Sequence, residues 1–199
     1  MRIIDVSHNN GRLNWAAIGE CAEIEGIQIK ASEGTGFTDP QFEINKAGAA
    51  GVGKPYGSYH FLRPDSDAGD QAAHYCSVIG NEVGALVPWI DVEVIPSSSS
   101  PHGDLWYSIP IETRILKIIH FADVVLAQTG VDPALYASPS FVEEQLGSDP
   151  RLARFRLVVA EYGVSAPRIP APFTEYYGWQ NSESAHLAGM SGVDTDVMA

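Results

Sequence analysis

Two carboxylates stand two positions apart in the segment Ile90-Asp91-Val92-Glu93, inside an apolar run. If this run is a β-strand, both side chains project from one face and their backbone positions lie about 6–7 Å apart. Like charges this close raise the proton affinity of one of the two groups. A neutral acid beside an ionised carboxylate is what cleavage of a glycosidic bond requires. An Asp-x-Glu pair near a strand end is also typical of a solvated edge or of metal ligands, so the pair alone leaves these interpretations open.

Two more carboxylates lie near the ends of the chain. Asp5 falls within the first apolar run, and Asp194 falls within the last. The first and last strands of a closed barrel are neighbours, so Asp5 and Asp194 could face one cavity together with Asp91 and Glu93. Four carboxylates in one place could instead bind a divalent cation, which is the main chemical alternative.

Other catalytic and metal-binding patterns are missing from the sequence. The six histidines form no close cluster with the spacing of zinc ligands. Ser138 and Ser140 lack the Gly-x-Ser-x-Gly pattern of a hydrolase nucleophile. Gly34 and Gly36 follow an apolar run without the full phosphate-loop pattern, and we interpret them as a turn.

The composition is that of an acidic globular chain. Its 199 residues include 12 Lys and Arg against 25 Asp and Glu, a formal net charge of −13, and 45% of them are hydrophobic. Such a chain lacks the cations that bind nucleic acid or an anionic membrane, so we expect neither as a partner. Cys21 and Cys76 have no metal-ligand spacing, and we interpret both as small buried hydrophobic side chains rather than as a disulfide.

Targeting signals are not visible either. No stretch of 18 or more consecutive apolar residues predicts a membrane span. The first residues carry no charged region followed by a long apolar run, so no signal peptide is seen. We therefore expect a protein that acts where it is made, that another device exports, or that is already in its mature form.

Short apolar runs alternate with helical patterns, without a repeat or an obvious linker. The predicted strands are residues 2–7, 27–32, 57–62, 86–94, 134–138, 156–162, 176–181 and 193–197. The predicted helices are residues 14–21, 40–50, 66–79, 110–128 and 140–146. The helix over 110–128 has the clearest 3.6-residue spacing, in Ile111, Ile115, Ile118, Ile119, Ala122, Val125 and Leu126, and Gly130 follows as a stop signal.

This alternation predicts parallel βαβ units in one domain over residues 1–199. About eight strands suggest a closed barrel of the α/β class, an irregular one because few helices follow the later strands. We expect Ile90, Val92 and Val94 on an apolar face, opposite Trp89, Asp91 and Glu93. Likewise, we expect Gln28, Lys30 and Ser32 to share a polar face. Polar faces of this kind collect at the mouth of a barrel, where barrel enzymes have their active sites.

The Ser-rich stretch 96–101 is a predicted surface loop that follows the most informative strand, which leaves room for a substrate-lining role. Aromatic side chains near the predicted strand ends suit the apolar faces of sugar rings, although aromatics in strands are by default packing residues.

The sequence as a whole resembles family 25 of the glycoside hydrolases, the N-acetylmuramidase lysozymes. The matching segments run in order along essentially the entire chain: Ile4-Asp5-Val6-Ser7-His8 with Asn14-Trp15, Ile29-Lys30-Ala31-Ser32-Glu33-Gly34, Asp39-Pro40 with Phe42, Gly57-Ser58-Tyr59-His60-Phe61, Asp91-Val92-Glu93, Tyr136-Ala137-Ser138-Pro139, Val159-Ala160-Glu161-Tyr162, Trp179-Gln180 and Val193-Asp194.

The resemblance implies an irregular TIM-like barrel, written (β/α)5(β)3. It implies that Glu93 is the general acid, that Asp91 is its electrostatic partner, and that Asp5 and Asp194 are the other site carboxylates. The residues that it places along the sugar groove are Glu33, Tyr59, Tyr136, Tyr162, Trp179 and Gln180. The bond cleaved would be the β-1,4 bond between N-acetylmuramic acid and N-acetylglucosamine, without a cofactor or a metal.

The expected partner is therefore the glycan strand of bacterial peptidoglycan, and the expected state is a monomer. An i, i+2 pair spans the carboxyl separations of both retaining and inverting enzymes, so the spacing does not decide between them. In a third route the N-acetyl group of the substrate attacks the anomeric carbon, Asp91 stabilises the cyclic cation, and Glu93 protonates the leaving oxygen.

Two alternatives to a muramidase remain, a chitinase-like hydrolase on a related barrel and a non-catalytic wall-binding module. Family members often carry a C-terminal wall-binding module, and we expect none after Ala199. Without a leader, the chain fits a phage-encoded, endolysin-like protein, or a secreted enzyme in its mature form.

Overall fold

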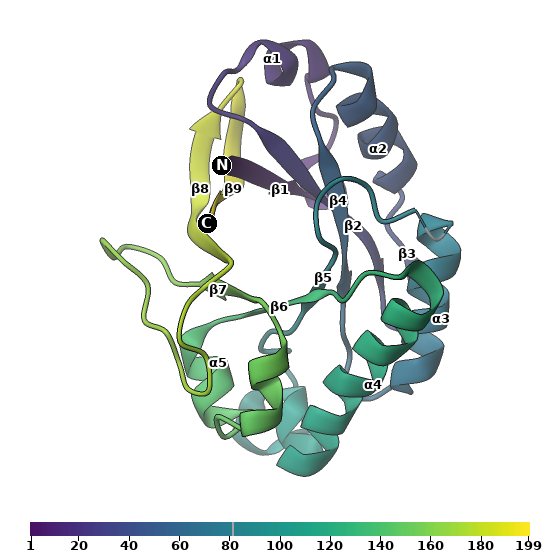
Figure 1. Ribbon diagram of the computed structural model, residues 1–199, viewed down its shortest axis with the longest axis vertical. Helices are drawn as coiled ribbons and strands as arrows, with labels where there is room; N and C mark the ends of the chain where they lie inside the picture. The colour runs from purple at the N-terminus through teal and green to yellow at the C-terminus, as the bar shows by residue number, and fades with distance from the viewer. Residues whose placement is uncertain (81) are drawn as a thin grey trace.

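Strands and helices alternate along residues 1–80 and 82–199, the part of the chain that the computed structural model describes (Figure 1). The strands are β1 (Arg2–Val6), β2 (Gly26–Glu33), β3 (Phe37–Thr38), β4 (Tyr56–Phe61), β5 (Trp89–Asp91), β6 (Ala134–Ala137), β7 (Leu157–Ala160), β8 (Gly178–Leu187) and β9 (Met190–Met198). The α-helices are α1 (Trp15–Glu20), α2 (Phe42–Gly51), α3 (Ala68–Ile79), α4 (Ile111–Thr129) and α5 (Pro139–Glu144). Short 3₁₀ helices are η1 (His8–Asn10), η2 (Pro101–Gly103), η3 (Leu105–Ser108) and η4 (Pro150–Arg154).

Eight of these strands close into a barrel, in the order β1-β2-β4-β5-β6-β7-β8-β9 and back to β1. Neighbours from β1 to β8 are parallel, whereas β9 is antiparallel to both β8 and β1. The two chain ends lie side by side, and the Met1 amine donates to the Met198 carbonyl oxygen over 3.1 Å (Figure 1). Each of the first five barrel strands leads to an α-helix, and β7, β8 and β9 follow without one. The predicted (β/α)5(β)3 barrel in a single domain is confirmed.

The helices begin and end at residues suited to capping. Asp67 accepts from the Asp70 amide at the start of α3, and Ser138 caps α5 just before Pro139. Gly130 ends α4 with a positive φ of 75°, which a side-chain-bearing residue adopts at a cost, so the predicted stop is confirmed.

The barrel separates two hydrophobic layers. The outer layer lies between the strands and the helices and contains most of the buried Ile, Leu and Val side chains. The inner layer fills the lumen and is built from Ile3, Tyr59, Trp89, Ala134, Tyr136, Val158, Ala160 and Met198. Trp89 and Tyr136 stack there with ring centroids 5.9 Å apart. The lumen is therefore a packed core whose aromatic side chains form the floor beneath the barrel mouth.

Two expected faces are wrong in detail. The strand predicted over 86–94 is reduced to β5 and stops at Asp91, so Val94 is 56% exposed instead of sharing a buried apolar face with Ile90 and Val92. On α4 the buried face includes Arg114 and Phe121, whereas the predicted face members Ile111 and Leu126 are exposed. Both differences arise because neighbouring elements, and not local periodicity, decide which face is covered.

A β-bulge at Ala31 changes the face of the residues that follow it in β2. Lys30 pairs with Tyr59, and the next pair is Ser32 with His60, so Ala31 is the extra residue. Ser32 consequently points toward the helices, and its hydroxyl lies 2.8 Å from the ring nitrogen Nδ1 of His60. The expectation that Ser32 shares the polar face of Lys30 is therefore wrong, because the bulge turns Ser32 outward.

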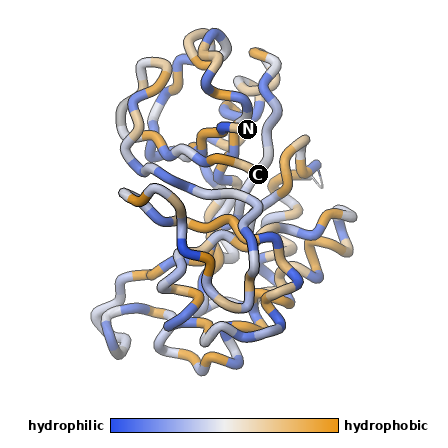
Figure 2. The backbone as a smooth tube through the Cα atoms, turned by 60° about the vertical axis from the view of Figure 1, so that its left-hand side comes forward, coloured by the Kyte–Doolittle hydropathy of each residue, from blue (hydrophilic) through white to orange (hydrophobic). Residues whose placement is uncertain are grey.

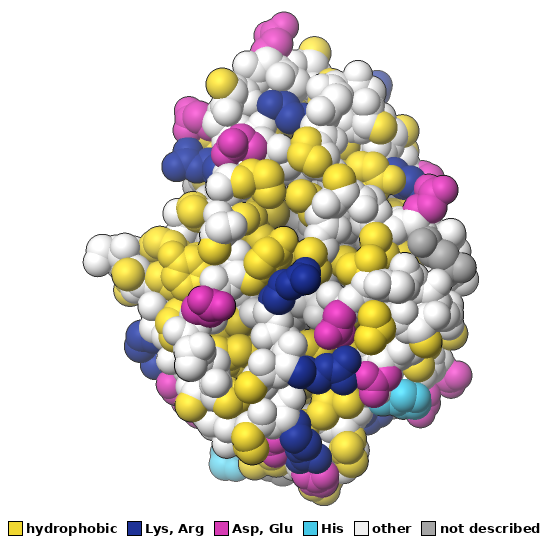
Figure 3. Space-filling model, in the orientation of Figure 1, with side chains coloured by type: hydrophobic (Ala, Val, Ile, Leu, Met, Phe, Trp, Pro, Cys, Tyr) yellow, Lys and Arg dark blue, Asp and Glu magenta, His cyan; other side chains and the backbone are white. Residues whose placement is uncertain are grey.

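The surface mixes polar, charged and apolar side chains. Along the backbone, hydrophilic and hydrophobic residues alternate in short runs (Figure 2). On the face in Figure 3, acidic and basic side chains are interspersed instead of forming one charged patch. Cys21 and Cys76 are both free, with Cys76 buried and Cys21 partly exposed. Within the described residues, no helix is long and apolar enough to cross a membrane.

The packing of α1 on α2 depends on Gly48. A Cβ atom at this position would lie 2.1 Å from the Trp15 indole ring, so we expect Gly48→Ala to destabilise the protein by about 1–3 kcal/mol despite the better helix propensity of alanine. Urea unfolding measures this loss. Gly51→Ala, in the same helix with no atom within 4 Å of the new Cβ, is the matched control and should be neutral or stabilising. Equal effects of the two substitutions would contradict the close approach.

Candidate active site

A small cavity of about 50 Å³ lies at the mouth of the barrel, above the lumen core. Its lining consists of Asp5, Tyr59, Trp89, Asp91, Glu93, Tyr136 and Asp194. The structure thus brings together all four carboxylates singled out in the sequence and two of the expected groove tyrosines. They come from β1, β4, β5 and the residues after it, β6, and β9.

Strand register explains this convergence. Asp5 on β1 pairs directly with Asp194 on β9. Asp91 is the last residue of β5 and pairs with Tyr136 of β6. Glu93 lies two residues beyond the end of β5, above Asp91. Because the carboxyl ends of parallel strands meet at one rim, residues far apart in the sequence share one cavity.

Asp91 and Glu93 form a coupled pair of acids. Burial raises the pKa of Asp91 well above its usual value, and the charge of Glu93 raises it further. Burial also raises the pKa of Glu93, although hydrogen bonds with Asp91 and Tyr136 partly oppose this. Because the charge of one carboxyl group changes the proton affinity of the other, the raised pKa values belong to the pair and the two groups titrate together.

The side-chain amide of Gln180 holds the Asp5 carboxylate. The Gln180 Nε2 donates to Asp5 Oδ2 over 2.8 Å, and the Gln180 Oε1 accepts from the Tyr136 hydroxyl over 2.6 Å and from the Tyr162 hydroxyl. Burial and the charge of Asp194 raise the pKa of Asp5 well above its usual value, and a hydrogen bond from Tyr59 opposes the rise. Gln180 is only 1% exposed, so it connects Asp5 to the two tyrosines from inside the wall.

Asp194 and a residue that sequence reasoning missed complete the acidic cluster. Burial, with the charges of Glu93 and Glu183, raises the pKa of Asp194 to about 6. Asp196, two residues later on the same face of β9, is fully buried, and among the described residues neither of its carboxyl oxygens has a hydrogen-bond partner. Burial and the charges of Asp5 and Asp194 raise the pKa of Asp196 well above its usual value. The alternation Asp194-Thr195-Asp196 was the available signal, since i and i+2 share a strand face.

Lys30 supplies positive charge beside these acids. Its ammonium donates to Glu33 Oε2 over 2.9 Å and lies 4.8 Å from the centroid of the Phe61 ring. Arg63 donates to the other Glu33 oxygen over 3.1 Å. Burial alone would raise the pKa of Glu33, but the hydrogen bonds from Lys30 and Arg63 lower it. Glu33 is absent from the linings of the cavities at the barrel mouth. Its carboxylate instead holds the ammonium group of Lys30.

A second cavity of about 260 Å³ adjoins the first and shares Glu93 and Tyr136 with it. Its other lining residues are Val94, Ser138, Ala160, Tyr162 and Glu183. Glu93 and Tyr136 therefore lie where the two cavities meet. Tyr162, which is 39% exposed, presents its ring to this second space.

Trp179 is placed differently from the expectation. Gln180 faces the lumen, so strand alternation puts Trp179 on the opposite face of β8. Its indole N–H donates to the Glu161 carbonyl oxygen over 2.8 Å, which ties β8 to the end of β7. Trp179 is absent from the lining of both cavities, because the face that it occupies points away from them.

Two further features that could support chemistry are the side chains able to ligate a metal and the cavity at the other end of the barrel. Within the described part of the chain, no three His, Cys, Asp or Glu side chains are arranged to hold a metal ion. A larger cavity of about 530 Å³ lies at the opposite end of the barrel, between residues 153–157, residues 172–177 and Ala199. Glu175 is the one acidic side chain among its described lining residues, so this cavity lacks the paired acids of the mouth.

Comparisons with known proteins agree with this geometry. The model of glycosyl hydrolases family 25 matches residues 4–190. The chain belongs to this family. It is 31% identical over 194 residues to "Lysozyme M1" of Streptomyces globisporus, and 32% identical over 192 residues to the "Autolytic lysozyme" of Clostridium acetobutylicum. These alignments cover 95% and 96% of the chain, but 64% and 53% of those two relatives, so the chain spans little more than half to two thirds of their length.

The family barrel is also found among solved structures. The bacterial lysozyme of Streptomyces coelicolor superposes with a TM-score of 0.87 at 29% identity, covering all of this chain and 91% of that one. Family 25 membership therefore rests on the sequence and on the barrel together.

The buried carboxyl group of Asp196 makes the stability of the folded protein depend on pH. The pKa of Asp196 is raised in the folded state, so above the ordinary pKa of an aspartate the unfolded chain releases a proton that the folded protein keeps, and stability falls as pH rises. Asp196→Asn has no such proton. We expect the free energy of unfolding of this variant to fall less steeply with pH, by up to about 1.4 kcal/mol per pH unit.

Urea unfolding at several pH values measures the slope. Asp70→Asn, which removes an exposed carboxyl from α3, is the matched control. An unchanged slope in Asp196→Asn would mean that Asp196 is ionised in the folded protein.

Proposed function

We propose that this domain is a lysozyme that hydrolyses the β-1,4 bond between N-acetylmuramic acid and N-acetylglucosamine in the glycan strands of bacterial peptidoglycan. The observation that carries the proposal is the pair Asp91 and Glu93, two buried acids with raised pKa values, where two cavities that share Glu93 and Tyr136 adjoin. Family membership and the names of the two relatives support the same reaction class.

Glu93 is the proposed general acid. It is the one carboxyl that both cavities share, and burial raises its pKa toward the range in which a carboxyl keeps its proton. The protonated form would donate to the oxygen of the leaving sugar. The Tyr136 side chain, which lines both cavities beside Glu93 and whose hydroxyl donates to Gln180, would limit the directions that the Glu93 carboxyl can take.

Asp91 is the proposed stabiliser of positive charge, in a route assisted by the substrate. Asp91 is 6% exposed, lines the smaller cavity, and has an Oδ1 without a hydrogen-bond partner among the described residues. The N–H of an N-acetyl group would donate to this oxygen while the acetyl oxygen attacks the anomeric carbon. The cyclic cation would then be stabilised by the charge of Asp91.

The remaining groove residues are proposed either to contact the sugar chain or to orient other residues of the site. Tyr59, Tyr136 and Tyr162 are proposed to contact sugar, since they line the two cavities. Gln180 and Glu33 are proposed to orient Asp5 and Lys30, since both are committed to internal hydrogen bonds.

The substitution that tests the proposal is Glu93→Gln, which is nearly isosteric and removes only the proton donor. We expect lysis of purified peptidoglycan to fall by about 10²–10⁴-fold with an unchanged melting temperature. Glu43→Gln, an exposed position on α2, is the matched control and should keep full activity.

The same assay is run with and without exhaustive chelation, which should make no difference. Retention of more than about a tenth of the activity by Glu93→Gln would remove Glu93 from the role of general acid. Activity restored by Mg²⁺ or Ca²⁺ would indicate a metal-dependent hydrolase. Hydrolysis of chitin with no action on peptidoglycan would indicate a chitinase-like enzyme.

A second prediction concerns the pH profile of activity. Both pKa values of the Asp91–Glu93 pair are raised, so activity should follow a bell on the acidic side of neutrality. In Asp91→Asn the neighbouring negative charge is gone, and Glu93 releases its proton at a lower pH. We expect the basic limb of the residual activity to move to lower pH, as measured by initial rates across the range. A basic limb that stays in place would mean that the two acids are not coupled.

A further inference from the structure

Glu93 lies outside the regular strand that carries Asp91. Strand β5 ends at Asp91, and the Val92 amide makes one more bond to the adjacent strand, donating to the Tyr136 carbonyl oxygen over 3.0 Å. The main chain then leaves the barrel toward η2 and η3. The sheet therefore does not hold Glu93, and another part of the fold must set its position.

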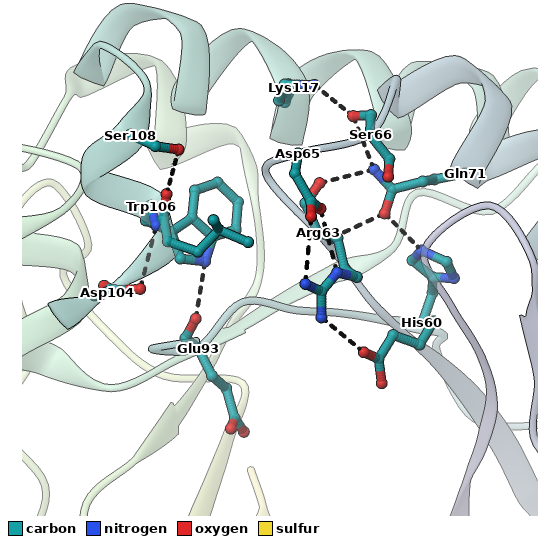
Figure 4. Close-up of polar contacts among 12 residues, drawn as sticks. His60, Arg63, Asp65, Ser66, Gln71, Glu93, Asp104, Trp106, Ser108 and Lys117 are labelled. Carbon is teal, nitrogen blue, oxygen red and sulfur yellow. Dashed lines mark hydrogen bonds and ion pairs between the residues drawn. The ribbon is translucent and has the colours of Figure 1, made fainter. Parts of the chain in front are cut away.

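The indole of Trp106 makes that contact. Its Nε1–H donates to the Glu93 carbonyl oxygen over 2.8 Å, and the ring is fully buried, edge-on to Phe141 of α5. Figure 4 shows the Glu93 carboxyl pointing away from the indole. The hydrogen bond thus fixes the main chain of Glu93, and the Glu93 carboxyl group faces the cavity.

Asp104 fixes both Trp106 and the residues after Glu93. Its Oδ1 accepts from the Trp106 amide over 3.2 Å and from the Ile95 amide over 3.0 Å. Ile95 lies two residues after Glu93, so one carboxylate holds the chain that leaves Glu93 and the helix that bears Trp106. Asp104 is 3% exposed, which keeps water from competing for these bonds.

Two further buried side chains hold Asp104 in turn. The Gln145 Nε2 donates to Asp104 Oδ2 over 2.8 Å, and Arg114 Nη1 donates to Gln145 Oε1 over 2.7 Å. Arg114 lies on α4 and Gln145 ends α5, and both are 4% exposed. These hydrogen bonds form one continuous series from the outer helices α4 and α5 to Glu93.

We propose that Trp106 is a positioning residue for the general acid, and that Asp104 holds Trp106 in place through Gln145 and Arg114. The proposal rests on the proposed role of Glu93. Trp106 is absent from the linings of both cavities, so it acts on the main chain of Glu93 and not on substrate. Since a displacement of about 1 Å in a catalytic group can cost about 10²-fold in rate, loss of this contact should reduce kcat and leave KM unchanged.

Trp106→Phe is the first test, because phenylalanine keeps an aromatic ring beside Phe141 and removes the N–H donor. On soluble, uncross-linked glycan strands we expect kcat to fall by about 10–100-fold with KM within about twofold of the parent protein. Ser108→Ala is the matched control in the same short helix, where it removes the hydrogen bond from Ser108 to the Leu105 carbonyl oxygen, and it should leave kcat unchanged.

The results of this test separate the two proposals. A kcat of Trp106→Phe within about twofold of the parent value, with Glu93→Gln inactive, would overturn the positioning role and leave the general acid intact. Full activity of Glu93→Gln would instead overturn the proposed function.

A second set of variants tests the hydrogen bonds that link Arg114, Gln145 and Asp104 to Trp106, without removing an aromatic ring. In Asp104→Asn the new amide faces the donating Gln145 Nε2, and in Gln145→Glu the new carboxylate faces the Asp104 carboxylate, so each single variant has one mismatched pair. The double variant Asp104→Asn with Gln145→Glu restores every donor to an acceptor, including Arg114. We expect kcat to fall in each single variant and to recover to within about threefold of the parent in the double variant. Equal kcat in all four proteins, or no recovery in the double variant, would overturn the proposal.

Discussion

The antiparallel pairing of β1 with β9 is the contact on which the rest of the site depends. It joins residues 2–5 to residues 194–197 and closes a barrel whose other neighbours from β1 to β8 are all parallel. Closure places Asp5 opposite Asp194 and brings both beside Asp91 and Glu93. Without it, Asp91 and Glu93 would lose the barrel wall opposite them and with it part of the burial that raises their pKa values.

Burial of so many acids in one barrel opposes stability and supports chemistry. Asp5, Asp91 and Asp196 are buried, and burial is the largest cause of the raised pKa of each. The nearby cation, Lys30, is itself paired with Glu33, so it offsets only part of the repulsion. The aromatic lumen core and the contact between the chain ends offset this cost, and burial raises the proton affinity that the proposed general acid needs.

The barrel and its four acids could be predicted because they depend on local signals. Alternating strands and helices predict the barrel, and the i, i+2 carboxylates predict a shared face. The bulge at Ala31, the early end of β5 and the outward direction of Trp179 could not be predicted in this way, because each depends on how a neighbouring strand or helix packs. Trp106 belongs with these, since a contact that joins residues 93 and 106 leaves no periodic trace in the sequence.

The proposed chemistry depends on a proton that Asp91 and Glu93 share because burial and the repulsion between their charges raise their pKa values. Carboxyl-carbon NMR of the protein with labelled Asp and Glu, titrated from pH 3 to 8, measures this directly. Two side-chain carboxyl resonances should titrate together above the ordinary range of carboxyl groups, and in Asp91→Asn this coupled titration should become a single step at lower pH. Independent titration of both groups near their ordinary pKa values would contradict it.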